Sequence, residues 1–488
     1  MTVLLQADWQ RRRRKRTIAM KVLLVSTYEL GHQPFGLASP AAWLAEAGAE
    51  VSCLDLAVES LDEDAIRAAG LIAVYLPMHT ATRLASTVIP RIRALNPAAH
   101  VCFYGLYAPL NEAFLRTELG GGTVLGGEFE SGLVSLYKRL SANGSVALEP
   151  QSEPVISLIK QDFRVPRRQG LPQLSRYAYV DLGQGRRRTV GYTEASRGCK
   201  HLCRHCPVVP VYGGRFRVVP RGVVIEDISQ QVAGGAEHIT FGDPDFFNGV
   251  GHAIRLGEEL HGQFPDLTYD VTIKVEHLLK HAHHLETLAR TGCLFVTTAV
   301  ESVDDRVLTI LDKGHTRDDF VRLVGLARGV NLTLSPTFIP FLPWIGREGY
   351  LDLLRLLAGL GLVDYVAPVQ LAIRLLVPEG SLLLVVPEMQ QHLGNFDAAA
   401  LSYRWSHPDP SVDVLHGRVR RAVEAGEAVG SSRREIFTEV WRLAHEACGL
   451  NVPDLDLPET LDAPIHVPCL SEPWYCCAEP TENQLAEF

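Results

Sequence analysis

The chain has 488 residues, enough for about three domains of typical size, and 47% of its residues are hydrophobic. Its formal net charge is −9, and the balance outside residues 1–19 is −14, because that segment holds six basic residues and one acidic residue. Such an acidic body excludes a broad nucleic-acid-binding face. No segment reaches the roughly 18 uncharged apolar residues that a membrane span requires.

Residues 1–19 form a basic leader that is predicted to be disordered. The alternative is a targeting or nucleic-acid-binding arm, although Lys21 and Glu29 interrupt the apolar stretch that a twin-arginine export signal needs. Met20 stands directly before the first strand-like run and is an alternative start of the chain. Without a secretory signal, we expect a cytoplasmic protein whose clustered cysteines serve metal or redox chemistry.

Residues 20–140 alternate short apolar runs with helix-length segments. The runs predicted to be strands are Lys21–Ser26, Glu50–Leu56, Leu71–Leu76 and His100–Tyr104, and the predicted helices include Ser39–Ala47 and Ala81–Leu95. This alternation predicts an α/β fold with a doubly wound parallel sheet. Such sheets bind ligands beyond the carboxyl ends of their strands, where this chain has glycine-rich loops.

Residues 141–190 have little periodicity and many prolines, so they are predicted to be a linker along the next domain. A second alternating region covers residues 191–390. Its predicted strands are His238–Phe241, Leu267–Ile273, Leu294–Val300, Leu332–Phe338 and Val366–Arg374. The pattern predicts a full or partial (β/α) barrel. Residues 391–488 are predicted to be helical around Arg418–Cys448 and then extended.

Three cysteines, Cys199, Cys203 and Cys206, stand together at the start of the second region. Thiolates are the soft ligands of iron–sulfur clusters, and three of them leave the fourth iron of a cubane open. Zinc is the alternative metal, but zinc sites usually use two separated cysteine pairs and no second pair follows nearby. Cys53, Cys102 and Cys293 stand in apolar runs and are predicted to pack in cores.

At these residues the sequence resembles the radical S-adenosylmethionine (SAM) superfamily, and the likeness continues over residues 190–385. The resemblance implies a 4Fe–4S cluster on the three cysteines and a bound SAM that yields a 5′-deoxyadenosyl radical. It also implies SAM contacts by Gly242, Asp243, Pro244 and Asp245, and by Glu301 and Ser302. Each of these residues alone could instead be a helix cap or an ion-pair partner. His281, His283 and His284 are predicted to lie on a solvated helix face.

With that match, residues 20–140 resemble the cobalamin-binding domain that precedes the barrel in one branch of the superfamily. The resemblance implies a bound cobalamin that Gly36, Leu37, Gly105 and Gly127 contact. The Asp-x-His-x-x-Gly motif of other cobalamin proteins is absent, and His32 is predicted to be an ordinary loop residue. The alternative is a sheet that has kept its shape and lost the cofactor.

The run Cys476–Cys477–Ala478–Glu479–Pro480 resembles the tail of a radical SAM subgroup named for it, the CUAEP/CCAEP proteins. The pair Cys476 and Cys477 is predicted to be catalytic, as a redox pair, as metal ligands or as a hydrogen or sulfur donor. A disulfide between adjacent cysteines would be strained, because their Cα atoms lie only ~3.8 Å apart. An exposed tail with incidental thiols is the alternative.

These resemblances predict a cobalamin-dependent radical SAM methyltransferase that acts on an unactivated centre of a small molecule or peptide. They also imply an electron donor such as flavodoxin or ferredoxin, and neither a nucleic acid nor a membrane as partner. One alternative is a radical cyclase or rearrangement enzyme without methyl transfer. Another, from a different class, is a thiol protein that binds selenium or arsenic on the tail.

Overall fold

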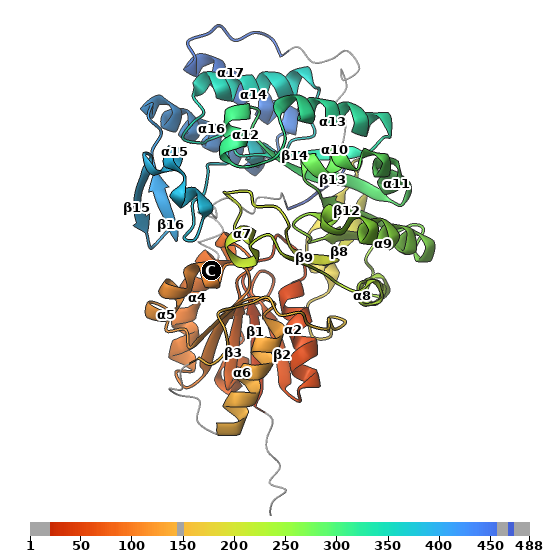
Figure 1. Cartoon of the computed structure of the whole chain (residues 1–488), viewed down its shortest axis with the longest axis vertical. Helices are drawn as coiled ribbons and strands as arrows, with labels where there is room; N and C mark the ends of the chain where they lie inside the picture. Colours follow the sequence, from red (N-terminus) through yellow and green to blue (C-terminus); the bar gives the residue numbers. More distant parts are fainter. Residues whose placement is uncertain (1–19, 144–150, 456–466, 473–488) are drawn as a thin grey trace, which may run out of the picture.

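The computed structural model describes residues 20–143, 151–455 and 467–472. Two α/β bodies lie one above the other along the long axis of the molecule (Figure 1). The N-terminal body is at the bottom of that view, and the second body, with the C-terminal helices, is at the top. Both bodies contain a mainly parallel sheet, so the predicted α/β fold class is confirmed.

The N-terminal body is a doubly wound parallel sheet. Its strands are β1 (Lys21–Ser26), β2 (Glu50–Asp55), β3 (Leu71–Tyr75), β4 (His100–Tyr104), β5 (Thr123–Gly127) and β6 (Ile156–Ser157), in the order β2-β1-β3-β4-β5-β6. Side chains alternate between two cores, with Val22 and Leu24 in one and Leu23 and Val25 in the other. This period of two is what a sheet covered on both faces requires.

Five helices cover the two faces of this sheet. The first core includes side chains of α2 (Phe35–Glu46) and α6 (Glu130–Asn143). The second core includes side chains of α3 (Glu63–Ala68), α4 (His79–Leu95) and α5 (Glu112–Thr117). Because β2 and β3 flank β1 on opposite sides, the chain reverses its direction of winding at β1, which is where such sheets bind ligands.

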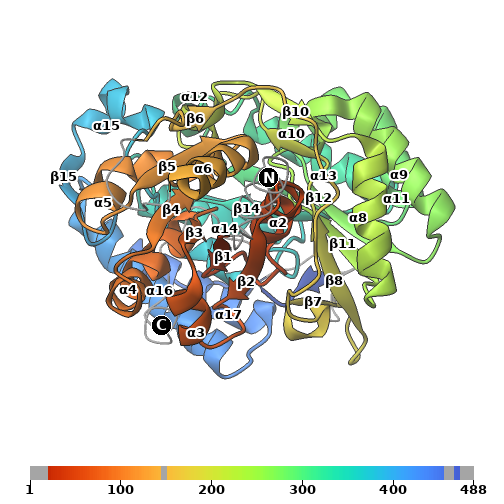
Figure 2. The same cartoon turned by 90° about the horizontal axis from the view of Figure 1, so that it is seen from below.

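The second body is a curled half-barrel. Its parallel strands are β8 (Arg187–Thr193), β11 (His238–Phe241), β12 (Thr268–Thr272), β13 (Cys293–Glu301) and β14 (Thr333–Phe338). Two short antiparallel strands extend the edge beyond β8, namely β7 (Tyr179–Asp181) and β17 (Cys469–Leu470). The helices that follow the strands lie on its outer side (Figures 1 and 2). They are α8 (Arg221–Ala233), α9 (Val250–Gln263), α10 (Val275–Lys280), α11 (Leu285–Arg290), α12 (Asp305–Ile310), α13 (Arg317–Gly329) and α14 (Arg347–Gly359).

The predicted strand Val366–Arg374 is wrong. The segment forms the short 3-10 helix η5 (Pro368–Leu371), and only Arg374 makes an isolated bridge, with Phe341. Pro368 lacks the N–H that a ladder needs, and it suits the first position of a helix. The Gln370 side chain accepts a hydrogen bond from the Phe338 N–H (3.1 Å), so it occupies the donor at the end of β14 that a further strand would have used.

Residues 151–190 connect the bodies and contribute to both sheets, with β6 in the first and β7 in the second. Arg168, in this connecting segment, links the two bodies. Its guanidinium contacts both carboxylate oxygens of Asp227 (2.7 and 2.8 Å), the Gln33 side chain (2.8 Å) and the Tyr192 carbonyl (2.6 Å). A bidentate pair of this kind is geometrically specific. The connection therefore holds a loop of the N-terminal body against the second sheet.

The C-terminal region packs on the second body, and its two long helices lie at the end of the molecule opposite the N-terminal sheet (Figure 1). It consists of α15 (Pro387–Gln390), the hairpin β15 (Leu393–Asp397) and β16 (Ser402–Trp405), and the helices α16 (Pro410–Ala428) and α17 (Arg433–Ala447). The predicted helical region Arg418–Cys448 thus contains the second half of α16 and all of α17. Among the described residues, no helix combines the length and the apolar character needed to cross a membrane.

Candidate active site

A cavity of about 330 Å³ is lined by residues of both bodies. The N-terminal body supplies side chains at or just beyond the carboxyl ends of β1, β3, β4 and β5, including Glu29, Tyr75, Met78, Tyr107 and Phe129. The second body supplies residues at or beyond the carboxyl ends of β11 to β14, and the loop that holds Cys199, Cys203 and Cys206. The ligand-binding edges of the two sheets therefore share one cavity.

The segment 199–206, called the cluster loop below, lies between β9 (Ser196–Gly198) and α7 (Val208–Tyr212). Cys199 and Cys203 are buried, and Cys206 is half-buried. Asn248 holds the start of the loop, because its side chain accepts from the Lys200 N–H (3.1 Å) and donates to the Gly198 carbonyl (3.2 Å). All three cysteines line one wall of the cavity, which suits a shared metal cluster with one side open.

Burial raises the pKa of the Cys199 thiol to about 11. Metal binding must therefore displace a proton from this thiol, as it does in other thiolate sites. The ammonium group of Lys313 lies near Cys203 and Cys206 and interacts favourably with their thiolate forms. The donor set of three soft sulfurs beside a cation fits an iron–sulfur cluster better than it fits a hard cation.

The turn after β11, residues 242–245, packs against the segment that directly precedes the cluster loop. Gly242 is required there, because a Cβ atom would lie 1.9 Å from the Tyr192 hydroxyl. Asp243 accepts hydrogen bonds from the Ala195 N–H (2.8 Å) and the Ser196 hydroxyl (2.5 Å), and burial raises its pKa to about 7. Gly242, Asp243, Pro244 and Asp245 all line the cavity, and their contacts with SAM stay a prediction.

Glu301 stands at the carboxyl end of β13 with a left-handed backbone (φ 68°), an unusual conformation for a residue with a side chain. Its carboxylate lies 3.2 Å from both the Lys313 ammonium and the His205 ring, so it connects the β13 end to the cluster loop. Glu301 lines the main cavity. Ser302 and Glu301 both line a second cavity of about 230 Å³, so Glu301 borders two cavities and Ser302 only the second.

We expect Glu301 to stabilise the fold in a pH-dependent way. Lys313 and His205 outweigh the effect of burial and lower the pKa of its carboxyl from 4.5 to about 2. A lowered folded-state pKa gives stability above pH 4.5 that is lost as the pH falls toward 2, on the order of 3 kcal/mol. Denaturant unfolding of the wild type and of Glu301→Gln between pH 7 and pH 3 measures the effect.

The two proteins in that comparison should differ most at pH 7, and the difference should shrink as the pH falls. Glu286→Gln, at an exposed position, is the control and should track the wild type. A gap between wild type and Glu301→Gln that stays constant over the whole range would contradict the expected linkage.

Arg197, which no sequence motif predicted to be functional, links the two bodies beside Cys199. Its guanidinium meets three carboxylates, those of Glu130 (2.6 Å), Glu194 (2.5 Å) and Glu128 (3.6 Å). Glu128 and Glu130 belong to the N-terminal body, whereas Glu194 and Arg197 stand directly before the cluster loop. Burial raises the pKa of Glu128 to about 7, while the pKa of Glu130 is lowered by Arg197 and by hydrogen bonds. The sequence contains Arg197 next to the cysteine motif, but no local pattern indicates its partners.

The predicted cobalamin contacts in the N-terminal body differ in position. Gly127 lines the cavity, whereas Gly36, Leu37 and Gly105 are not among its lining residues. Gly105 has a packing reason of its own: its φ is 116°, and a Cβ atom would lie 2.7 Å from the Leu76 carbonyl oxygen. Leu37 is fully buried in the core between α2 and the sheet.

The N-terminal wall of the cavity has features that suit a large, mainly apolar ring with polar edges, as a corrinoid is. Tyr75, Met78, Tyr107 and Phe129 supply apolar and aromatic surface. Within the described residues, the buried Oε2 atom of Glu29 has no hydrogen-bond partner, and such atoms usually find one in a ligand or water. His32 stacks on Tyr192 (4.8 Å between centroids), and burial lowers its pKa to about 4.

Cys476 and Cys477 lie outside the described residues, so their predicted catalytic role stays a prediction. The described part of the tail ends beside the site. Cys469 and Leu470 pair with β7, Leu470 lines the cavity, and the Tyr28 hydroxyl donates a hydrogen bond to the Glu472 carboxylate. His281, His283 and His284, predicted to be solvated, are half-buried or exposed.

Comparison with known proteins agrees with this geometry. Residues 193–357 match the family model of the Radical SAM superfamily. The hopanoid C-3 methylase of Methylococcus capsulatus is 24% identical over 325 residues, which cover 62% of this chain and 61% of that protein. The chain thus spans about three fifths of the length of this curated relative.

Two solved structures share the fold. The radical S-adenosylmethionine methyltransferase TsrM from Kitasatospora setae is 20% identical with a TM-score of 0.58, over 68% of this chain and 70% of that chain. The cobalamin-dependent S-adenosylmethionine radical enzyme OxsB is 14% identical with a TM-score of 0.65, over 84% of this chain and 68% of that chain. The likeness to OxsB agrees with the arrangement of an N-terminal parallel sheet before a half-barrel.

The half-barrel with a cysteine loop at its open end defines a radical SAM domain. The chain carries that domain in residues 193–357, and the domain implies a 4Fe–4S cluster and SAM as cofactors.

Proposed function

We propose that this chain is a cobalamin-dependent radical SAM methyltransferase that acts on an unactivated centre of a small molecule or peptide. The observation that carries the proposal is the shared cavity, in which the three cysteines face the carboxyl edge of the N-terminal sheet. Support comes from TsrM, solved with cobalamin and a 4Fe–4S cluster, and from OxsB, solved with aqua-cobalamin and SAM. The hopanoid C-3 methylase is a further methyl-transferring relative.

Each group of residues has a distinct task in this proposal. Cys199, Cys203 and Cys206 hold the cluster, and the Gly242–Asp245 turn and Glu301 hold SAM. The wall with Tyr75, Phe129 and Glu29 holds the corrinoid. When bound, the cluster and SAM supply a hydrogen-abstracting radical, and the corrinoid supplies the methyl group. A reductant such as flavodoxin or ferredoxin would supply the electrons that the cluster needs.

The protein contributes burial and positioning. Arg197 and Arg168 keep the two bodies in register, so groups held by one wall face those held by the other. The cavity surface between them is largely apolar, which keeps water away from reactive groups. The finer assignment to the subgroup with the Cys-Cys-Ala-Glu-Pro tail is part of the proposal, and it rests on Cys476–Pro480 alone.

We expect about four irons and one cobalt per chain after anaerobic purification and reconstitution with iron, sulfide and hydroxocobalamin. The metals are measured by elemental analysis and absorbance spectra. With methyl-labelled SAM and a candidate acceptor, the product should gain one methylene unit in mass. A product of unchanged mass would favour a cyclase or rearrangement enzyme instead.

Cys203→Ala is the matched variant in the same experiment. It should lose iron and keep cobalt, because the corrinoid wall belongs to the other body. Iron without cobalt in the wild type would contradict the proposal and leave the N-terminal sheet as a scaffold.

A further inference from the structure

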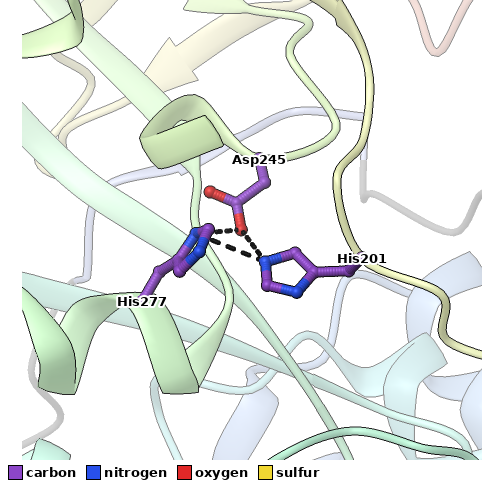
Figure 3. Close-up of side chains that lie close together, drawn as sticks. All are labelled: His201, Asp245 and His277. Atoms are coloured by element: carbon purple, nitrogen blue, oxygen red, sulfur yellow. Dashed lines mark hydrogen bonds and ion pairs between the residues drawn. The ribbon is translucent and has the colours of Figure 1, made fainter. Parts of the chain in front are cut away.

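Two histidines and an aspartate meet next to the cluster loop (Figure 3). His201 belongs to the cluster loop, Asp245 to the turn after β11, and His277 to α10. Their ligand atoms converge: His201 Nε2 lies 3.5 Å from Asp245 Oδ2 and 3.4 Å from His277 Nδ1, and His277 Nδ1 lies 2.8 Å from Asp245 Oδ2. Three segments far apart in the sequence therefore place one donor atom each at a common point.

These separations are close to those around a bound ion. Zinc and similar ions hold nitrogen and oxygen ligands at ~2.1 Å, so the ligand atoms of a tetrahedral shell lie roughly 3.4 Å apart. Two of the three distances already have that value, and the third needs a widening of about half an ångström. Two imidazoles and one carboxylate also form a recognised donor set for divalent transition metals, which leaves coordination positions open.

The three side chains are largely buried, so their convergence differs from the chance proximity of exposed polar side chains. Asp245 and His277 are each 2% exposed, and the His201 side chain is 13% exposed. The other oxygen of Asp245 accepts from the Phe247 N–H (2.9 Å), which fixes the carboxylate with Oδ2 toward the histidines. His201 and Asp245 both line the central cavity, so an ion held here borders it.

The second nitrogen of His201 faces a pair of charged groups. His201 Nδ1 lies 3.3 Å from the Lys274 ammonium and 3.8 Å from Glu276 Oε2, and Lys274 and Glu276 are 3.1 Å apart. A metal on Nε2 places the ring proton on Nδ1, where a carboxylate is the usual acceptor. The Glu276 side chain is 40% exposed, so its carboxylate has solvent-facing room to move toward Nδ1.

The competing arrangement uses the same atoms without an ion. In it, the Lys274 ammonium donates to His201 Nδ1, and both histidines donate to Asp245. The two arrangements differ in where the His201 proton sits and in whether Lys274 keeps its contact with that ring. Binding measurements separate them directly.

We propose that His201, Asp245 and His277 bind one divalent transition-metal ion, such as Zn²⁺ or Fe²⁺, as a second metal site beside the cluster loop. The ion links the cluster loop to α10 and directs its open coordination positions toward the cavity. Its exchangeable ligand is water or an oxygen or nitrogen atom of a bound molecule. The site depends on the chain's own residues and is independent of whether cobalamin binds.

The test uses the full-length chain with its reconstituted cluster, dialysed anaerobically against Zn²⁺. We expect one zinc per chain in addition to the cluster iron. Asp245→Asn and His277→Ala should each weaken zinc binding at least 10-fold, since removing even an outer partner of a ligand costs that much. His283→Ala is the matched control, because it removes an exposed histidine near α10 and should keep the zinc.

A second measurement, of Co²⁺ binding, tests the site in a chain that cannot form the cluster. In a full-length background with Cys199, Cys203 and Cys206 all changed to alanine, Co²⁺ should bind once per chain with a visible spectrum free of thiolate charge-transfer bands. Adding His277→Ala should remove that spectrum, while circular dichroism matches that of the His283→Ala counterpart. Equal metal content with and without His277, or thiolate bands only, would overturn the site and leave a hydrogen-bonded triad.

Discussion

Alanine in place of Cys203 is expected to empty the cluster site and abolish SAM cleavage. Cys203 is 7% exposed, lines the cavity and lies near the Lys313 ammonium. With one of three sulfurs gone, two ligands cannot hold a cubane against hydrolysis, and the iron content should fall from about four per chain to a small fraction of one. Iron and sulfide analysis and the formation of 5′-deoxyadenosine from SAM measure the two losses.

Cys102→Ala is the matched control for this variant. Cys102 is fully buried in the N-terminal sheet, and burial raises the pKa of its thiol, so it is a packing residue. Its alanine variant should lose some stability and keep both iron and SAM cleavage. Full iron in Cys203→Ala, or zinc in place of iron in the wild type, would rule out the cluster assignment.

Methionine in place of Arg197 is expected to destabilise the junction of the two bodies by about 3–5 kcal/mol at neutral pH. Arg197 is 5% exposed and is the cation that three buried or nearly buried carboxylates share. Methionine keeps the bulk near Phe35, Phe129 and Phe163 but leaves those carboxylates without their charge partner. The urea midpoint, followed by tryptophan fluorescence, measures the change.

Two further variants test the cause of this effect. Arg290→Met removes an exposed arginine whose pair with Glu258 is loose (3.7 Å), and it should cost less than about 0.5 kcal/mol. Adding Glu130→Gln to Arg197→Met should recover part of the loss, because one uncompensated charge is removed. If Arg197→Met unfolds at the same urea concentration as Arg290→Met, the buried network does not stabilise the junction.

Local pattern was enough to predict much of the fold. Lys21–Ser26, His100–Tyr104 and His238–Phe241 are strands with the predicted bounds. Their apolar, β-branched runs are short and end at loop residues, which is the signal that sequence carries best. The failure at Val366–Arg374 has a local cause too, since Pro368 favours a helix start over a ladder.

In the candidate site, too, the features carried by one short segment were predictable from the sequence, and those made by tertiary packing were not. The spacing of Cys199, Cys203 and Cys206 is local, because one loop carries all three ligands, and the motif therefore identified the radical SAM domain from sequence. The partners of Arg197, the position of Glu301 between two cavities, and the meeting of His201 with Asp245 and His277 were not predictable. Each depends on how separate elements are placed against one another.

By itself, then, the sequence determined the class of protein, the two alternating α/β regions and the cluster motif, because hydrophobic periodicity and ligand spacing act over a few residues. Only the tertiary structure decided which walls share a cavity, which carboxylates surround Arg197 and which side chains converge beside the cluster loop. Those contacts follow from the packing of two sheets edge to edge, and packing is a property of the whole folded chain.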